Sequence, residues 1–353
     1  MVAAMRTALF LLPTDLMGGA EKVLRLTAEA AARAGLFDRV VVFVLAGPPS
    51  GSLDALAAQG AEVVHARART QRAALPALLR TFSRERYTLV FSTHSHLNAA
   101  ASAARKLGLL RTRRLVARES TLIFERDLGP TGRLVRGLYH LYGAQDRIVC
   151  QTERMACSLQ KHTRGRFAAA TRHVPNPVEA TSRVLAKPPA ETFDIVWCGR
   201  LAPVKAPERA LGALQRLRAQ GHDARLTILG DGPLRSALER RAVDLGIEDA
   251  TTFAGRVADP KARMAEHDLG LLTSDIEGFP NVVLEMLAAG VRRVVTTDCA
   301  GGLREIPGVL VAPHNPHALA TALLEAHATP APTGLDAFLA ERSPDAFLQA
   351  IVA

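Results

Sequence analysis

Short apolar runs alternate with helical stretches along nearly the whole chain, and this alternation constrains the fold more than any other feature. Strands that alternate with helices form a parallel sheet with helices on both faces. The helical stretches of the first half are residues 20–34, 53–59 and 97–107. Its predicted strands are Thr7–Leu12, Val40–Leu45, Glu62–His65, Leu89–Ser92, Arg114–Ala117 and Arg147–Gln151.

The pattern breaks at residues 173–193, where four prolines and no clear period indicate a linker. A second series of strands follows: Asp194–Cys198, Leu226–Leu229, Thr251–Ala254, Leu269–Thr273, Val294–Thr297 and Val309–Val311. Helices are expected between them at 206–219, 233–245, 259–266, 280–289 and 316–327, with a helical end over 335–353. The 353 residues exceed a typical single core, so two domains are expected, and one large α/β barrel is the alternative.

We therefore predict two Rossmann-like, doubly wound parallel-sheet domains over 1–173 and 194–353, joined by a hinge at 174–193. The final helix is free to pack back on the N-terminal domain. Ligands of such sheets bind beyond the carboxyl ends of the strands, so candidate site residues are sought in strand-to-helix loops.

The charge of the chain is unevenly distributed. The net charge is +10, and residues 105–172 contain fifteen Lys or Arg against five Asp or Glu. Such a segment favours an anionic partner, either a membrane surface, a phosphorylated substrate or nucleic acid. An Arg-rich surface without a partner is the alternative. Nucleic acid is disfavoured, because the segment lacks interleaved aromatic residues that would stack on bases.

Targeting and redox signals are sparse. No stretch reaches the roughly 18 apolar residues of a membrane span. The N-terminus resembles a first strand more than a signal peptide. The four cysteines lack CxxC spacing, which indicates neither a zinc site nor a disulfide framework and fits a reducing cytosol.

Two loops of the first domain could contact a ligand. Gly18 and Gly19 follow the first strand and precede a helix, so the backbone and the helix N-terminus can approach an anion. The pair is not a GxGxxG dinucleotide fingerprint, and a tight turn is the plain alternative. His94 and His96 follow the fourth strand, where either could orient a substrate hydroxyl or lie on the surface.

Two loops of the second domain carry charge. Gly199 ends a strand, and Arg200 and Lys205 follow it, a combination that suits a diphosphate. Glu277 lies in the loop after a later strand, and Glu285 lies inside the next helix, which Pro280 is expected to open. Carboxylates accept hydrogen bonds from paired sugar hydroxyls, so the two loops together would suit a nucleoside diphosphate sugar.

Seven segments in order resemble one family. They are GGAEKVL (18–24), VPNPV (174–178), GRLAPVKAP (199–207), LGDGPLR (229–235), FAGRV (253–257), SDIEGFPNVVLEMLAAG (274–290) and TTDCAGGLREI (296–306). The chain resembles a retaining glycosyltransferase of family 4, and the spacing of Glu277 and Glu285 matches the family's E-x7-E signature. The resemblance covers nearly the whole chain and implies the GT-B fold, with two domains facing a central cleft.

The resemblance also implies roles for individual residues. Glu285 would bind ribose, Glu277 would face the transferred sugar, and Arg200 and Lys205 would neutralise the diphosphate. Gly18 and Gly19 would let the N-terminal domain close on the phosphates. His94 or His96 would lie near the sugar. The implied donor site also contains Gly199, Gly255, Arg256, Val257, Gly278, Phe279, Pro280 and Asn281, while Arg118 and Glu119 would lie on the acceptor side.

The activity implied is a metal-independent, retaining transfer of a hexose or N-acetylhexosamine, without a cofactor, from a UDP-linked donor by preference. Asp275-Ile276-Glu277 is a near miss to a metal-binding DxD pair. The acceptor would be a lipid-linked or cell-surface polysaccharide or lipopolysaccharide precursor, and the enzyme would be cytoplasmic and peripheral on the inner face of the plasma membrane. Front-face attack is favoured, with the leaving phosphate accepting the acceptor's proton.

Two other functions are compatible with two α/β domains of this kind. A catalytically silent GT-B partner or activator should have lost Arg200, Lys205, Glu277 or Glu285, and all four are present. A nucleotide-sugar epimerase would need acid/base groups in both domains and has no reason for the E-x7-E spacing. The chain departs from the family at GVRRVV (290–295), where many relatives have Gly-x-Pro-Val, and after Ile306, where the usual Gly-rich loop is missing.

Overall fold

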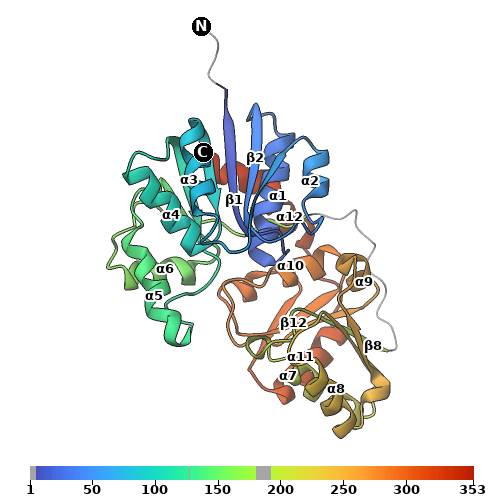
Figure 1. Cartoon of the computed structure of the whole chain (residues 1–353). Helices are drawn as coiled ribbons and strands as arrows, with labels where there is room; N and C mark the ends of the chain where they lie inside the picture. The colour runs from blue at the N-terminus through green and yellow to red at the C-terminus, as the bar shows by residue number, and fades with distance from the viewer. Residues whose placement is uncertain (1–4, 127, 180–191) are drawn as a thin grey trace. The chain divides into compact units, whose positions relative to one another are not determined.

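The computed structural model describes residues 5–126, 128–179 and 192–353, which form two compact units (Figure 1). The first unit contains the described residues up to Pro177 together with Arg342–Ala353, and the second runs over Val178–Glu341. Residues 180–191 of the predicted hinge lie outside the described residues. Each unit has its own sheet and its own hydrophobic core.

The described part of the first unit contains a seven-stranded parallel sheet in the order β3-β2-β1-β4-β5-β6-β7. The strands are β1 (Thr7–Thr14), β2 (Arg39–Ala46), β3 (Glu62–Ala68), β4 (Tyr87–Ser92), β5 (Thr112–Arg118), β6 (Arg147–Cys150) and β7 (Thr171–His173). β1 pairs with both β2 and β4 and is apolar and buried over most of its length, as a strand covered on both faces must be. The strand order reverses between β1 and β4, and doubly wound sheets commonly bind ligands beyond the carboxyl ends of the strands at such a point.

Helices cover both faces of this sheet. The first unit contains α1 (Gly19–Arg33), α2 (Asp54–Ala58), α3 (Leu75–Arg84), α4 (Ser95–Lys106), η1 (Gly129–Thr131), α5 (Gly132–Gly137), η2 (Leu138–His140), α6 (Glu153–His162) and α13 (Pro344–Val352). α1, α2 and α13 pack on the face that contains Phe10 and Phe91, and α3 and α4 pack on the face of Leu9 and Leu11. The first two crossovers therefore lie on one face and the next two on the other, as expected where the strand order of a doubly wound sheet reverses.

The C-terminal helix α13 belongs to the first unit (Figure 1). The ring of Phe347 packs edge-on against Phe91 at 6.3 Å, and Leu348 and Ile351 enter the same core. The helical end predicted over 335–353 is divided in two, because Pro344 can open a helix but cannot continue one.

The described part of the second unit has a six-stranded parallel sheet in the order β10-β9-β8-β11-β12-β13. Its strands are β8 (Phe193–Cys198), β9 (Ala224–Leu229), β10 (Thr251–Gly255), β11 (Leu269–Leu272), β12 (Arg293–Thr297) and β13 (Val309–Ala312). Its helices are η3 (Pro203–Lys205), α7 (Glu208–Ala219), α8 (Arg235–Asp244), η4 (Glu248–Ala250), α9 (Pro260–Ala265), α10 (Asn281–Ala288), η5 (Leu303–Glu305), α11 (Pro316–Ala328) and α12 (Leu335–Ala340). The two sheets confirm the predicted fold class.

A buried ion pair lies within residues 290–295, where the sequence departs from the family pattern. The Nε and Nη2 atoms of Arg292 donate to the two carboxylate oxygens of Asp268, at 3.0 and 2.8 Å, and the pair is almost completely buried. Arg292 also donates to the carbonyls of Ala326, His327 and Thr329 at the end of α11. Arg292 therefore links the start of β12 to the end of α11 through charge-assisted hydrogen bonds.

Candidate functional site

The second unit brings Lys205 and Glu277 together. Lys205 ends the short helix after β8, and Glu277 lies in the loop after β11, and these two strands are neighbours in the sheet. The Nζ atom of Lys205 donates to Oε1 of Glu277 at 2.5 Å, and both side chains are about one-fifth exposed. Sequence reasoning placed one at a diphosphate and the other at a sugar, and the structure shows that these two groups are in direct contact.

A network of hydrogen bonds fixes this pair. The hydroxyl of Ser274 also donates to Oε1 of Glu277 at 2.8 Å, and the backbone N–H of Glu277 donates to the carbonyl of Cys299. The hydroxyl of Thr273 accepts from Trp197 Nε1 at 3.0 Å and donates to the carbonyl of Lys205 at 2.9 Å. Because these supports are buried, the backbone of Lys205 and the carboxylate of Glu277 are held in place before any ligand binds.

The stretch Asp275-Ile276-Glu277 nearly matches a metal-binding DxD motif, but both of its carboxylates form ion pairs. Asp275 pairs with Arg209 at 2.6 Å, and Glu277 pairs with Lys205. A divalent ion would have to displace two cations to use this pair of carboxylates. Within residues 5–126, 128–179 and 192–353, no group of three or more His, Cys, Asp or Glu is arranged to hold a metal ion.

Close backbone contact shapes the Gly199 loop. The N–H of Gly199 donates to the carbonyl of Leu229, and the N–H of Gly230 donates to the carbonyl of Gly255 at 2.7 Å. A Cβ atom on Gly230 would overlap the carbonyl oxygen of Gly199, and a Cβ on Gly232 would overlap that of Leu201. Gly230 also has φ +131°, which side chains rarely adopt. The glycines therefore allow the loops after β8, β9 and β10 to pack backbone against backbone.

The other predicted donor-site residues lie on the same edge of this sheet. Arg200 is exposed, as is Arg256, while Val257 is half-buried. Glu285 is half-buried in α10, five residues from its start. Gly255, which ends β10, has φ +68°. The loop from Gly278 to Asn281 leads into α10, and its residues alternate between buried and half-buried.

Pro280 is the residue that caps α10 and not its first helical residue, because its ψ of +91° is extended. The helix begins one residue later, at Asn281. The cap side chain makes no hydrogen bond to the first turn, as expected for proline. Residue 280 therefore provides no side-chain cap for the backbone N–H groups at this end of the helix. Backbone N–H groups at a helix N-terminus can bind phosphate oxygens.

The first unit brings His94 and Glu21 together. His94 caps the N-terminus of α4, and Glu21 lies in the first turn of α1. His94 Nε2 is 3.2 Å from Glu21 Oε1, and the other ring nitrogen is 3.1 Å from the hydroxyl of Thr93. Burial tends to raise the pKa of Glu21, but hydrogen bonding and charge from His94 bring that pKa below its usual value. A Cβ at residue 18 would lie 2.7 Å from Oε2 of Glu21, so a larger residue there would push on this carboxylate.

His96 differs from His94. The two rings are 5.8 Å apart, yet among the described residues no group forms a hydrogen bond with the buried Nε2 of His96. Burial, assisted by the charge of His94, lowers the pKa of His96 to about 4. His96 is therefore neutral at pH 7, with one ring nitrogen left for a polar partner.

Arg118 and Glu119 were predicted on the acceptor side. Arg118 ends β5, Glu119 directly follows it, and both are buried. Arg118 donates to Asn176 at 2.7 Å, while its Nε and Nη1 atoms have no hydrogen-bond partner in the described part of the chain. Burial lowers the pKa of Arg118 to about 9. The carboxylate of Glu119 is held by the hydroxyls of Tyr139 at 2.5 Å and Tyr142 at 2.8 Å, and burial raises its pKa.

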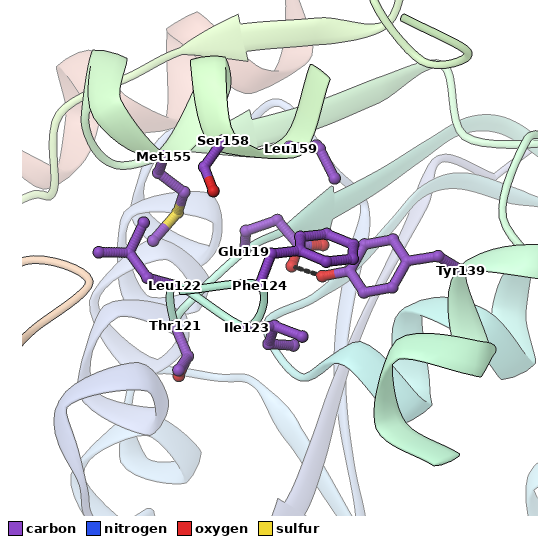
Figure 2. Close-up of a pocket in the computed structure, with 9 residues that line it drawn as sticks. All are labelled: Glu119, Thr121, Leu122, Ile123, Phe124, Tyr139, Met155, Ser158 and Leu159. Atoms are coloured by element: carbon purple, nitrogen blue, oxygen red, sulfur yellow. Dashed lines mark hydrogen bonds between the residues drawn. The ribbon is translucent and has the colours of Figure 1, made fainter. Parts of the chain in front are cut away.

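Glu119 and Tyr139 also line a small cavity beneath α6, and Figure 2 shows their hydrogen bond at its wall. The remaining lining is largely apolar and includes Leu122, Phe124 and Met155. The cavity volume of ≈ 10 Å³ is close to the least that holds one water molecule, about 10–15 Å³. In this conformation the cavity is too small for a sugar, and Glu119 serves to anchor the two tyrosines.

Sequence reasoning missed three residues of these sites. Glu21 stands inside the GGAEK segment, where an acidic residue in a first helical turn could have been noted as a partner for a loop histidine. Ser274 stands three residues before Glu277, within reach of its carboxylate. Thr273 gave no signal in the sequence, because it stands at the end of an apolar strand. Only the structure places its hydroxyl beside Trp197.

Comparison with known proteins matches each unit to a glycosyltransferase family profile. Residues 17–182 match the profile of glycosyltransferase family 4, and residues 192–329 match that of glycosyl transferases group 1. In solved structures, the chain is similar to Anabaena HepE in complex with UDP and glucose, with a TM-score of 0.79 and 20% identity over 99% of this chain and 98% of that one. It is also similar to the lipopolysaccharide outer core galactosyltransferase WaaB, with a TM-score of 0.71 and 16% identity over 98% of this chain and 97% of that one. These neighbours show the GT-B fold.

Two curated relatives match shorter parts. A GDP-mannose-dependent alpha-(1-6)-phosphatidylinositol dimannoside mannosyltransferase of Mycobacterium tuberculosis is 40% identical over 109 residues, which are 30% of this chain and 28% of the relative. An N-acetylgalactosaminyltransferase of Campylobacter jejuni, named for a diphospho-undecaprenol-linked acceptor, is 34% identical over 114 residues, 32% of this chain and 30% of the relative. The matches therefore span less than a third of either relative's length.

Proposed function

The chain belongs to glycosyltransferase family 4, and on that premise we propose that it transfers a hexose or N-acetylhexosamine from a nucleoside diphosphate sugar to a lipid-linked acceptor. The observation that carries the proposal is the contact of Lys205 with Glu277 beside the Gly199 loop. An ammonium suits a phosphate oxygen and a carboxylate suits sugar hydroxyls, so the pair sits where a sugar is joined to its diphosphate.

The other residues of the second unit fit the rest of the donor. Arg200 is exposed and can reach a diphosphate with a bidentate guanidinium. The amide end of α10 can hold phosphate oxygens, and Glu285 within that helix would accept hydrogen bonds from ribose. In this assignment Lys205 moves from Glu277 to the phosphate when the donor binds, and Glu277 is then free to hold the sugar.

We propose a retaining, front-face reaction without a metal ion. The bond between the sugar's anomeric carbon and the diphosphate oxygen breaks, and the acceptor oxygen forms its bond on the same face. The proton of the acceptor hydroxyl goes to the leaving phosphate. The charge that develops on that phosphate would be stabilised by the cations of Arg200 and Lys205 and by the α10 amides.

The first unit would contribute hydroxyl-orienting groups. His94 and His96 follow β4, and Gly18 and Gly19 are the cap and first residue of α1, all at the carboxyl edge of their sheet. His96 is the better candidate for contact with a substrate hydroxyl, because the two nitrogens of His94 already face Glu21 and Thr93. Arg118 would serve an anionic group of the acceptor.

The names of similar proteins support two different donor nucleotides. HepE is described with UDP and glucose, and the mycobacterial relative is named for GDP-mannose. We propose UDP as the first nucleotide to test and GDP as the second. A lipid-linked acceptor is supported by the names of both curated relatives, one a phosphatidylinositol mannoside and the other a diphospho-undecaprenol. Attachment to an anionic membrane surface would bring the enzyme to such an acceptor.

A thermal-shift screen over UDP-, GDP- and ADP-sugars tests the donor, since a bound ligand raises the melting temperature. Glu285→Ala should weaken donor binding, and Lys205→Ala should lower turnover, measured as nucleotide release, more than donor affinity. Lys261→Ala is a matched control, because Lys261 forms a half-buried ion pair with Glu179 in the same unit, at 3.1 Å. If both site variants behave like the control, the site assignment is wrong. If no nucleotide sugar binds wild type, the activity is wrong.

A further inference from the structure

The loop after β11 places a second carboxylate beside the pair formed by Lys205 and Glu277. Asp275 stands two residues before Glu277, and its backbone N–H donates to the carbonyl of Val204 at 2.9 Å. Val204 directly precedes Lys205, so Asp275 lies next to the cation that we assign to the donor diphosphate. The side chain of Asp275 is 48% exposed. Its negative charge would repel a diphosphate held by Lys205 unless a cation neutralised it.

Arg209 supplies the opposite charge. It is the second residue of α7, and its Nη1 atom lies 2.6 Å from Oδ1 of Asp275. A second group near this carboxylate is His314, whose Nδ1 atom is 3.9 Å from the same oxygen, too far for a hydrogen bond. Of these two groups, Arg209 is therefore the stronger partner of Asp275.

Arg209 is fixed in this position by a second acceptor. The same Nη1 atom donates to the backbone carbonyl of Thr273 at 3.0 Å. Thr273 is completely buried, and the side chain of Arg209 is only 21% exposed. In the proposed function Lys205 leaves Glu277 for the phosphate when the donor binds. Arg209, with two acceptors in one loop, would stay on Asp275 throughout.

The ion pair of Arg209 with Asp275 also has a plain structural interpretation, because it links the start of α7 to the loop after β11. The two interpretations differ in what they predict for Asp275. If the pair only fixes the loop, replacement of either partner should damage the site in the same way. If Arg209 cancels the charge of Asp275, the two replacements should act on donor binding in opposite directions.

We propose that Arg209 is a positioning residue of the donor site, which holds the carboxylate of Asp275 and cancels its charge so that this carboxylate does not repel the donor diphosphate. The proposal rests on the proposed function, since it needs a nucleoside diphosphate in this site. It adds a residue to that site, because Arg209 lies outside the seven segments that resemble the family.

Calorimetric titration with UDP at low salt tests the proposal, with GDP in its place if the donor screen selects GDP. Arg209→Met should weaken nucleotide binding about tenfold, because the charge of Asp275 is then left without its main partner. The loss should shrink at high salt, which screens a half-exposed charge. Asp275→Asn should bind at least as tightly as wild type, and the double variant Arg209→Met/Asp275→Asn should recover most of the lost affinity.

Arg218→Met is the matched control on the same helix. Arg218 pairs with Asp249 at 3.0 Å and donates to the carbonyl of Ala224, the first residue of β9, at the opposite edge of the sheet. This variant should bind the nucleotide like wild type. Melting temperatures of all the variants establish that each one folds.

The proposal is overturned if Asp275→Asn weakens binding as much as Arg209→Met, or if the double variant binds no better than Arg209→Met. Asp275→Asn keeps the test decisive if Arg209→Met does not fold, since weaker binding by Asp275→Asn contradicts charge cancellation by itself. Wild type that binds neither UDP nor GDP would overturn the proposed function and this inference with it. Wild type that binds, with unchanged affinity in Arg209→Met, would overturn this inference only.

Discussion

The imidazole of His94 and the carboxylate of Glu21 lie 3.2 Å apart, although they come from two different helix N-termini of the first unit. A carboxylate can only accept, so the nitrogen that faces Glu21 carries a proton. The Thr93 hydroxyl then donates to the other nitrogen when the ring is neutral. The pair thus fixes both the orientation and the tautomer of His94.

Glu21→Gln should lower turnover about tenfold, or about 1.4 kcal/mol, with little change in the KM for the donor. The reason is that an amide can present its NH₂ to His94 and release the ring from its orientation. Steady-state kinetics with the donor found in the screen measures the effect. Glu85→Gln is the matched control, since Glu85 pairs with Arg39 just before β4, at the opposite end of that strand. Equal rates in both variants would contradict a positioning role for Glu21.

The stability of the first unit should fall between pH 6.5 and pH 4 because of His96. Its pKa is about 4 in the folded chain and 6.5 in the unfolded one, so below pH 6.5 the unfolded state binds the proton that the folded state refuses. This loss of stability is absent above pH 6.5 and complete below pH 4. It then amounts to roughly 1–3 kcal/mol, after allowance for the partial exposure of His96.

Melting temperatures of wild type and His96→Gln at pH 7 and pH 5 measure this dependence. Wild type should lose more stability on acidification than the variant, because glutamine has no proton to bind. His140→Gln, at an exposed histidine, should follow wild type at both pH values. If His96→Gln keeps the full acid sensitivity of wild type, His96 does not cause it.

Lys205 and Glu277 should be energetically coupled in the absence of a ligand. Lys205→Met and Glu277→Gln each leave one half-buried charge without its main partner, so the double variant should be less destabilised than the sum of the singles. We expect a coupling of about 1–2 kcal/mol from thermal or denaturant unfolding of the four proteins. Additive effects would mean that the contact contributes nothing to the unliganded fold.

Gly230→Ala should destabilise the second unit by roughly 2–4 kcal/mol and weaken donor binding, because the new Cβ would overlap the Gly199 carbonyl and move the loop before Arg200. Gly221→Ala is the control. Gly221 also has a positive φ, +86°, but a Cβ there would meet no atom within 4 Å, so only the backbone strain of about 1 kcal/mol remains. Equal losses in the two variants would show that steric overlap at Gly230 is absorbed by its surroundings.

The elements that sequence predicted best were those with long, buried patterns. The strand Thr7–Thr14 and its neighbours are apolar along their length because helices cover both faces, and that pattern is visible without coordinates. β7, only three residues long and mostly exposed, has no such pattern and was missed. The helices α3 and α6 were also not singled out, because Pro76 and the polar ends of α6 obscure their period.

The sequence by itself determined two parallel α/β domains, the loops that hold charged residues, and the family to which they belong. Local spacing and the order of motifs carry that information, since strand-to-helix loops of a parallel sheet must share one edge. Only the tertiary structure decided that Lys205 contacts Glu277 and that Glu21 pairs with His94. It also decided that the hydroxyls of Tyr139 and Tyr142 donate to the carboxylate of Glu119. These partners come from separate loops, and their side-chain contacts depend on sheet order and burial, which no local pattern encodes.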